Sequence, residues 1–226
     1  MKTSPSFQER FEQFALISLE KQSKLESLIA DQTHELDLDG GRILFAGREI
    51  PMQVLGTESD NTLTWLWAWA EEQTEIPEQL LDASLRMRSW GSSANIPEFT
   101  IPSLDLDRTD GFALSLVASQ ICNASCHFRD VYEGGALYLL LFDREIDNLS
   151  PYDRSGLVRA MTNLFSRYEM NQRNALLSYI KLKGHALTER DGVLSVELET
   201  RERLVAEFDA RDKLVVINGT PFAPQD

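Results

Sequence analysis

Cys122, Cys126 and His127 form the one cluster of soft metal ligands and nucleophiles in this chain. A zinc site takes four such ligands, or three and an open position for catalysis, and no second Cys or His pair accompanies these three. Because Cys126 and His127 are adjacent, a strand would point their side chains to opposite faces, which argues against a Cys–His catalytic pair. Cys122 ends an apolar segment, where free cysteine serves as a small hydrophobe. We therefore expect no metal, no cofactor and no catalytic cysteine.

Two groups of carboxylates have residue types that could supply acid–base chemistry or bind a divalent cation. They are Glu71, Glu72 and Glu75, and further along the chain Asp105, Asp107 and Asp110. Their spacing matches no calcium-binding loop, and the chain has no G-x-S-x-G, P-loop or G-x-G-x-x-G motif. Since an acidic chain produces such groups by chance, a solvated surface is the preferred interpretation and no catalytic residue is assigned.

Three of the four tryptophans stand at alternate positions, at Trp65, Trp67 and Trp69. On a strand, alternate side chains share a face, so the indoles would form one row opposite Leu66 and Ala68. One interpretation buries this row as core beneath helices. The other exposes it as a stacking or docking surface. We prefer the core.

If the row lines a cleft instead, the chain is an enzyme or a small-ligand binder with an aromatic pocket. The candidate ligand-binding residues are then Trp65, Trp67, Trp69, Glu71, Asp130 and Tyr132. Glu71 or Asp130 would be the acid or base. The cleft would lie where the end of the tryptophan strand meets the Glu133-Gly134-Gly135 turn.

The elements that must position these residues follow from the hydrophobic pattern. Apolar residues at three- and four-residue steps predict an amphipathic helix over residues 6–31, with Ser6 and Glu9 spaced as a capping box. Short alternating runs separated by glycine turns predict a meander of four antiparallel strands over 34–70. Its last turn is expected at 56–61, immediately before the tryptophan strand.

The middle of the chain mixes helix and strand signals. Leucines at helical spacing predict a helix over 77–90, which Gly91 would end, and an extended connector or edge strand follows at 96–107. Residues 111–121 are apolar nearly all round, which predicts a buried helix. Residues 126–142 read as a hairpin whose second arm is apolar on both faces, as in a central strand.

The C-terminal third begins with two predicted helices. Ser150 and the proline after it indicate the start of the first, and the second is expected from Asn171 to Lys183 with Gly184 as its stop. Residues 185–219 then read as short strands. They form either a separate meander or an extension of the first sheet.

These elements predict an α+β fold: an antiparallel sheet meander with packed helices, a C-terminal helical pair and a short β-meander. A chain of 226 residues is one large domain or two small ones. We expect a helix-and-sheet domain with the tryptophan strand at 1–149. Residues 150–226 would hold the helical pair and last strands, packed on the first part as one globule.

Part of this pattern resembles a known family. The residues that carry the resemblance are Gly56-Thr57-Glu58-Ser59, Trp65-Leu66-Trp67-Ala68-Trp69-Ala70, the Phe112 helix and Tyr132-Glu133-Gly134-Gly135-Ala136-Leu137-Tyr138. They resemble an uncharacterised bacterial family, a domain of unknown function, in which a strand meander ends in W-L-W-A-W-A-N. The resemblance covers about residues 5–142. It implies a soluble bacterial α+β protein and no activity, and the final Asn of the signature is Glu71 here.

Charge and composition bound the function. A net charge of −14 disfavours nucleic acid and anionic membrane surfaces, which bind clustered Lys and Arg. The sequence shows no secretory signal and no run of 18 apolar residues, so the expected location is the cytoplasm. A basic protein partner is compatible with the charge. The leading hypothesis is a non-catalytic binding or interaction protein of accessory or immunity type, and a homodimer paired through the C-terminal strands is a further possibility.

Overall fold

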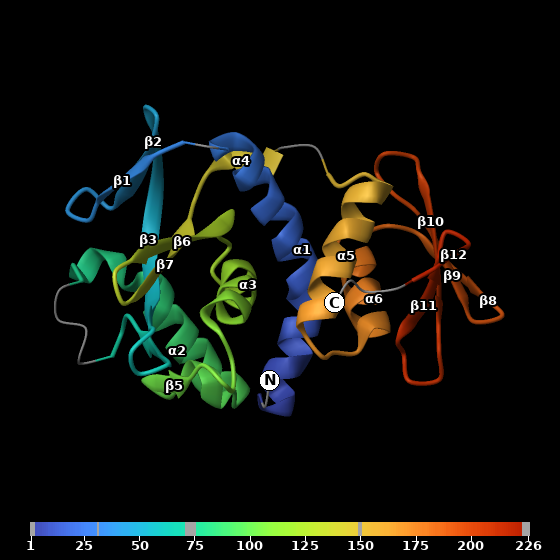
Figure 1. The fold of residues 1–226 in the computed structure, drawn as a ribbon, viewed down its shortest axis with the longest axis horizontal. Helices are drawn as coiled ribbons and strands as arrows, with labels where there is room; N and C mark the ends of the chain where they lie inside the picture. The colour runs from blue at the N-terminus through green and yellow to red at the C-terminus, as the bar shows by residue number, and fades with distance from the viewer. Residues whose placement is uncertain (1–2, 31, 71–75, 149–150, 223–226) are drawn as a thin grey trace. The chain divides into compact units, whose positions relative to one another are not determined.

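A computed structural model describes residues 3–30, 32–70, 76–148 and 151–222 (Figure 1). The chain folds into two compact units, one of Met1–Gln8 with Lys21–Leu149 and the other of Glu9–Glu20 with Ser150–Asp226. Packing of 1–149 and 150–226 as one globule stays a prediction. Helices combined with antiparallel sheets confirm the α+β class. Within the described ranges, no helix is both long and apolar enough to cross a membrane.

Helix α1 (Pro5–Ile29) contributes residues to both units. Its N-cap is Ser4, whose hydroxyl accepts a hydrogen bond from the amide of Phe7 at 3.2 Å. Pro5 suits the first helical position, because the amide that it lacks would have no partner there. The predicted capping box at Ser6 and Glu9 is therefore wrong, since Ser6 already lies inside the helix.

The first unit holds a seven-stranded antiparallel sheet. Its strands are β1 (His34–Asp37), β2 (Arg42–Phe45), β3 (Arg48–Ser59), β4 (Thr64–Trp67), β5 (Ser103–Asp105), β6 (Cys126–Tyr132) and β7 (Gly135–Leu141). The path β1-β2-β3-β4-β5 confirms the predicted meander, and β7 lies between β3 and β6 as the predicted central strand. The turn expected at 56–61 is wrong in its first part, because Gly56–Ser59 pair with both β4 and β7.

Two 3-10 turns and three further helices complete this unit. They are Glu78–Leu80, Pro97–Phe99, α2 (Asp82–Ala94), α3 (Gly111–Ile121) and α4 (Arg144–Asn148). The helix predicted to stop at Gly91 continues to Ala94, and Asn95 ends it at φ 54°. Gly91 is a packing glycine, because a Cβ there would lie 2.4 Å from the Cβ of Phe99. The buried helix at 111–121 is confirmed, with Asp110 as its N-cap.

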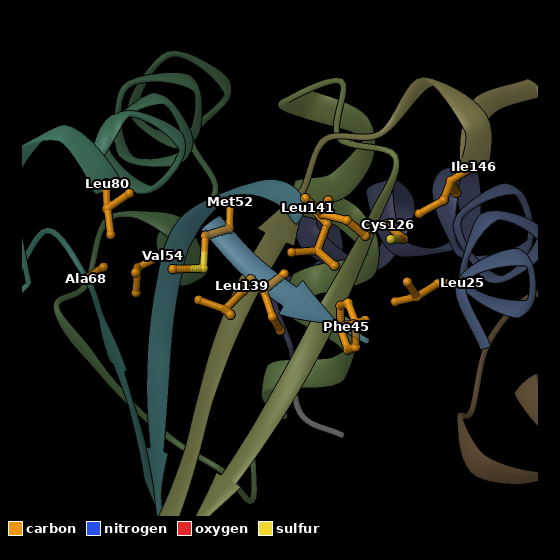
Figure 2. Close-up of a cluster of buried hydrophobic side chains, with 12 residues drawn as sticks. Leu25, Phe45, Met52, Val54, Ala68, Leu80, Cys126, Leu139, Leu141 and Ile146 are labelled. Atoms are coloured by element: carbon orange, nitrogen blue, oxygen red, sulfur yellow. The ribbon is translucent and has the colours of Figure 1, made fainter. Parts of the chain in front are cut away.

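A hydrophobic cluster between the strands and their helices forms the core of the first unit (Figure 2). Its buried members are Leu25, Ile43, Phe45, Ile50, Met52, Val54, Ala68, Leu80, Cys126, Leu139, Leu141 and Ile146. Most come from alternate positions of β2, β3 and β7, so the period-two pattern of the sequence determines which face is buried. This core fixes the sheet whose edges and ends carry the candidate site.

The second unit combines the helical pair with a five-stranded sheet of its own. Its elements are α5 (Arg154–Arg167), α6 (Gln172–Leu182), β8 (Leu187–Arg190), β9 (Val193–Glu197), β10 (Arg203–Phe208), β11 (Leu214–Ile217) and β12 (Thr220–Pro221). The strand order β12-β11-β10-β9-β8 makes a separate meander and not an extension of the first sheet. Helix α5 is capped by Asp153, which accepts from the amide of Gly156 at 2.6 Å, so the start predicted at Ser150 is too early. Ser150 lies outside the described residues.

Candidate functional site

The tryptophan row is part of the core. Trp65 and Trp67 alternate on β4, are 0% exposed and meet edge to face with ring centroids 5.3 Å apart. Trp69 follows the strand in a turn, and the guanidinium of Arg88 lies over its ring at 4.5 Å. The strand thus carries two of the three indoles, because β4 ends at Trp67. Their burial favours the core interpretation over a stacking surface.

Two glycines make room for the Trp65 indole. A Cβ at Gly56 would lie 2.4 Å from this ring, and one at Gly111 would lie 2.6 Å from it. Trp67 donates its Nε1–H to the carbonyl of Glu98 at 3.0 Å. The Trp65 Nε1 has no acceptor within the described part of the chain. The Trp65 ring is therefore in close contact with the backbone at both glycines and is fully buried.

A buried carboxylate lies beside this indole. Glu58 of β3 accepts from the amide of Gly111 at 2.7 Å and from the hydroxyl of Tyr138 at 2.8 Å. The Nε of Arg129 donates to the same hydroxyl at 3.0 Å and lies 3.5 Å from the Glu58 carboxylate. The Tyr138 and Trp65 rings meet edge to face at 5.3 Å. These contacts join β3, β6, β7 and the start of α3.

The electrostatics of this cluster indicate a structural role, in which the buried Glu58 carboxylate holds neighbouring strands together. Burial and the Glu58 charge raise the pKa of Tyr138 well above its ordinary value, against the opposing effect of Arg129. The tyrosine therefore stays protonated and donates to the carboxylate, as a buried charge requires. Sequence reasoning missed the cluster, because its members come from three strands and no local motif links them.

Asp130 and Tyr132, two further predicted site residues, lie elsewhere on the sheet. Asp130 of β6 lies beside β1, where its Oδ1 is 2.8 Å from Nε2 of His34. Tyr132 ends β6 and shares the strand face of Asp130. Strands β7 and β3 separate β6 from β4, so the structure does not bring these two residues beside the buried indoles. Glu71 lies outside the described residues.

Strand β6 forms an edge of the sheet, since among the described strands it pairs with β7 alone. The amide of His127 points away from β7 and donates to the side chain of Gln22 at 3.3 Å. Antiparallel pairing alternates inward and outward amides, so those of Arg129 and Val131 point outward too. Val131 is 64% exposed and Tyr132 49%. The end of β6 thus offers backbone donors next to exposed apolar side chains.

The Cys–His cluster is buried and unreactive. Burial raises the pKa of Cys122 to about 11 and also raises that of Cys126, so both thiols are protonated at neutral pH. Burial lowers the pKa of His127 to about 4, and its ring packs edge to face on Phe112. Cys122 lines an open groove of about 430 Å³ beside Arg86. Among the described residues no group of three or more His, Cys, Asp or Glu is placed to hold a metal ion.

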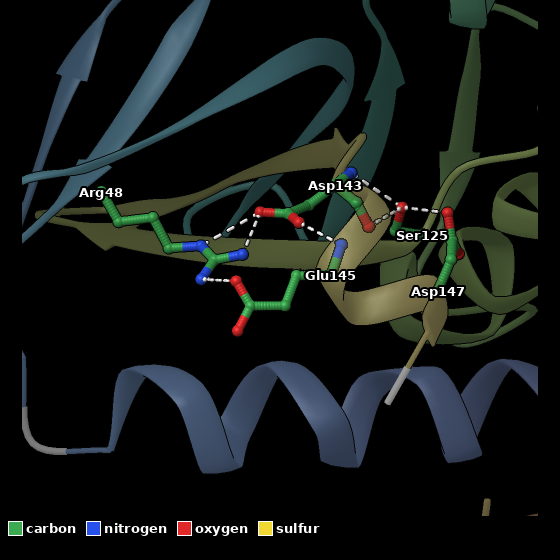
Figure 3. Close-up of polar contacts among 5 residues, drawn as sticks. All are labelled: Arg48, Ser125, Asp143, Glu145 and Asp147. Carbon is green, nitrogen blue, oxygen red and sulfur yellow. Dashed lines mark hydrogen bonds and ion pairs between the residues drawn. The ribbon is translucent and has the colours of Figure 1, made fainter. Parts of the chain in front are cut away.

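A second polar cluster secures α4 (Figure 3). The guanidinium of Arg48 donates to Asp143 at 2.5 and 3.0 Å and to Glu145 at 2.7 Å. Asp143 also accepts from the amide of Glu145, and its own amide donates to the hydroxyl of Ser125. The Ser125 hydroxyl lies 3.0 Å from Asp147. Burial opposes ionisation of Asp143, but its hydrogen bonds to Arg48 and backbone amides lower its pKa, so the pairing is ionic. Each polar group has a partner inside the cluster, which makes it a structural brace.

The fold and this arrangement define an α+β protein whose sheet, among the described strands, has an unpaired and partly apolar edge. Comparison with protein families gives a match over residues 8–144 to the family of unknown function DUF6882. The chain belongs to this family, which confirms the resemblance seen in the sequence. Searches of curated proteins and of solved structures returned no match.

Proposed function

We propose that the chain is a non-catalytic interaction protein of the bacterial cytoplasm, of accessory or immunity type. It binds a basic, extended segment of a protein partner along the free edge of β6. The observation that carries this proposal is the exposure of Val131 and Tyr132 on an unpaired strand end. Native proteins commonly protect such edges, because unpaired amides and carbonyls pair readily with another chain.

The open part of the edge has defined limits. Gln22 occupies the outward amide of His127, so the free stretch begins at Arg129 and ends at Tyr132. A partner strand added here would take its hydrogen bonds from the backbone and its specificity from side chains on alternate positions. Tyr132 is the residue type that interfaces favour for contact, because it joins an apolar ring to a polar hydroxyl.

Charge around the hairpin tip favours a basic segment. Glu133 forms the β6–β7 turn, and the amide of Asp60 in the neighbouring turn donates to the carbonyl of Gly134 at 3.0 Å. Both carboxylates are exposed, and the chain as a whole carries a charge of −14. Arg129 is the cation on this stretch, and its charge is directed to Glu58 and Tyr138. Acidic groups at a rim speed association with a basic partner.

The chemistry of the described residues supports a binding role over catalysis. The buried thiols and the Tyr138 hydroxyl are protonated, and the indoles of Trp65 and Trp67 have no exposed surface for a substrate. This leaves the edge of β6 as the best-supported contact surface of the first unit.

The test compares two lysine substitutions on edge strands. Val131→Lys adds a charge to the free edge of β6, and Leu187→Lys makes the same change on β8, the edge strand of the other sheet, where Leu187 is 37% exposed. Immobilised chains of each kind are exposed to bacterial extract, and retained proteins are identified and purified. We expect a basic partner that binds the unmodified chain and Leu187→Lys, loses binding to Val131→Lys and elutes with salt. Equal binding to both variants, or turnover of a small substrate with no protein partner, contradicts the proposal.

A further inference from the structure

The second unit contains a hollow of about 470 Å³ between α5 and the segment that includes β11 and β12. This volume lies within the range of small-molecule sites in proteins. Arg154, Val158 and Arg159 line it from the helix, and Ile217, Asn218 and Phe222 line it from the other side. Its two guanidinium groups set it apart from a chain whose net charge is −14.

The two arginines differ in their partners. Within the described part of the chain, the Arg159 side chain makes no hydrogen bond or ion pair. Arg154 is loosely paired, with its Nε 3.9 Å from a carboxylate oxygen of Glu202. The nearest acidic neighbour in sequence, Asp153, uses its carboxylate to cap α5. Glu202 itself is held by the Arg154 backbone amide at 2.9 Å and by the Thr200 hydroxyl at 3.2 Å. Among the described residues, this one carboxylate stands against two guanidinium groups, which leaves the hollow with a net positive charge.

The other walls supply a fixed donor and an apolar surface. Asn218 accepts from the amide of Val205 at 3.0 Å through Oδ1, which leaves its Nδ2 hydrogens for another acceptor. The ring of Phe222 packs edge to face on Phe165 at 6.2 Å, and Ile217 is buried. The hollow therefore combines hydrogen-bond donors with an apolar, aromatic wall.

We propose that this hollow binds a small organic anion, with a phosphate or carboxylate head group at Arg154 and Arg159 and an apolar body against Val158 and Phe222. The planar guanidinium fork matches both head groups and holds them with two parallel hydrogen bonds. The acidic chain as a whole repels anions, so binding here depends on these local donors. The site is separate from the β6 edge and does not rest on the proposed partner binding.

The test is calorimetric titration of the full chain with phenyl phosphate, benzoate and the neutral analogue phenol. We expect saturable binding of at least one anion, with phenol much weaker. Arg159→Gln should weaken that binding by about tenfold or more, the usual loss for one charge-assisted hydrogen bond. The preference between phenyl phosphate and benzoate identifies the head group.

Two controls keep the result interpretable. Arg144→Gln makes the same charge change on α4, at an exposed arginine outside the hollow, and should bind like the unmodified chain. Because Arg159 has no partner among the described residues, Arg159→Gln should keep its melting temperature. Equal affinity in the two variants overturns the proposal, as does the absence of saturable binding for both anions.

Discussion

Each unit buries a glutamate beside a tyrosine hydroxyl and a cation, but the two clusters hold the cation at different depths. In the first unit the side chain of Arg129, 3.5 Å from Glu58, is 43% exposed. In the second unit the side chain of Lys183, 3.0 Å from Glu20, is 14% exposed. The same three chemical groups therefore lie in two different dielectric environments. The more buried cation should contribute more to the free energy of unfolding.

The neutral donors differ as well. Glu58 receives a backbone amide and the Tyr138 hydroxyl, two hydrogen bonds that do not depend on the cation. Glu20 receives the Tyr179 hydroxyl, whose pKa is raised by burial and by the Glu20 charge, so it stays a donor. Lys183 also bonds to Glu199 at 2.8 Å. The deeper burial of Lys183 indicates that the second cluster depends on its cation more than the first cluster does.

The largest expected effect comes from removing the buried ammonium. Lys183→Met removes the ammonium that lies 3.0 Å from the Glu20 carboxylate, which is 3% exposed. We expect a loss of about 3 kcal/mol in the free energy of unfolding, the usual result of breaking a buried ion pair. Urea denaturation followed by circular dichroism measures it.

The matched control for this prediction removes both charges. Lys183→Met combined with Glu20→Gln should recover most of the loss, because no uncompensated buried charge remains. A single Lys183→Met variant as stable as the unmodified chain would show that the ammonium contributes little, and the comparison of the two clusters would fail.

The histidines of the two units also differ in burial, but here the more deeply buried group lies in the first unit. Burial lowers the pKa of His127 from its ordinary value of 6.5 to about 4. Burial also lowers the pKa of His185 in the second unit, where the side chain is less buried. Between pH 6.5 and pH 4, His127 is protonated in the unfolded state and neutral in the folded state. Its contribution to stability is therefore fully present above pH 6.5 and is lost as the pH falls toward 4. Between pH 7 and pH 5, the His127 contribution should be a loss of about 2 kcal/mol.

A variant that cannot titrate isolates this contribution. His127→Gln should lose less stability than the unmodified chain when urea denaturation at pH 5 is compared with pH 7. His185→Gln, at the more exposed histidine, should change the pH dependence less. Identical pH profiles for His127→Gln and the unmodified chain would rule out burial of a neutral His127 as a source of acid sensitivity.

Elements with complete local signals could be predicted from the sequence. Helix α3 was predicted at its observed bounds, because its apolar run follows an N-cap at Asp110, and α6 follows Asn171 in the same way. Gly56 and Gly91 misled the prediction. The sequence suggests a turn residue and a stop residue, but each is small because an aromatic side chain of the following element packs on it, Trp65 of β4 and Phe99 of the second 3-10 turn respectively.

The candidate site could be predicted less well. The tryptophan row was located in sequence, but burial of Trp65 and Trp67 depends on which elements cover β4. Glu58 and Arg129 meet because β6, β7 and β3 are neighbours in the sheet, and this strand order leaves no local trace. The sequence predicts Tyr132 as part of a pocket, but it lies at the end of an edge strand. Long-range pairing therefore accounts for what the sequence could not show.

The smallest expected effect is the loss of the exposed cation in the first cluster. Arg129→Met should lower the free energy of unfolding by about 0.5 kcal/mol, since a guanidinium that is 43% exposed contributes little to an ion pair. Glu58 keeps its hydrogen bonds from Gly111 and Tyr138, so its buried charge is not left without donors. Urea denaturation should give Arg129→Met a clearly higher free energy of unfolding than Lys183→Met. If Arg129→Met and Lys183→Met lose equal free energy of unfolding, the hydrogen bonds from Gly111 and Tyr138 are not sufficient to stabilise the Glu58 carboxylate. The burial of the cation would then not distinguish the two clusters.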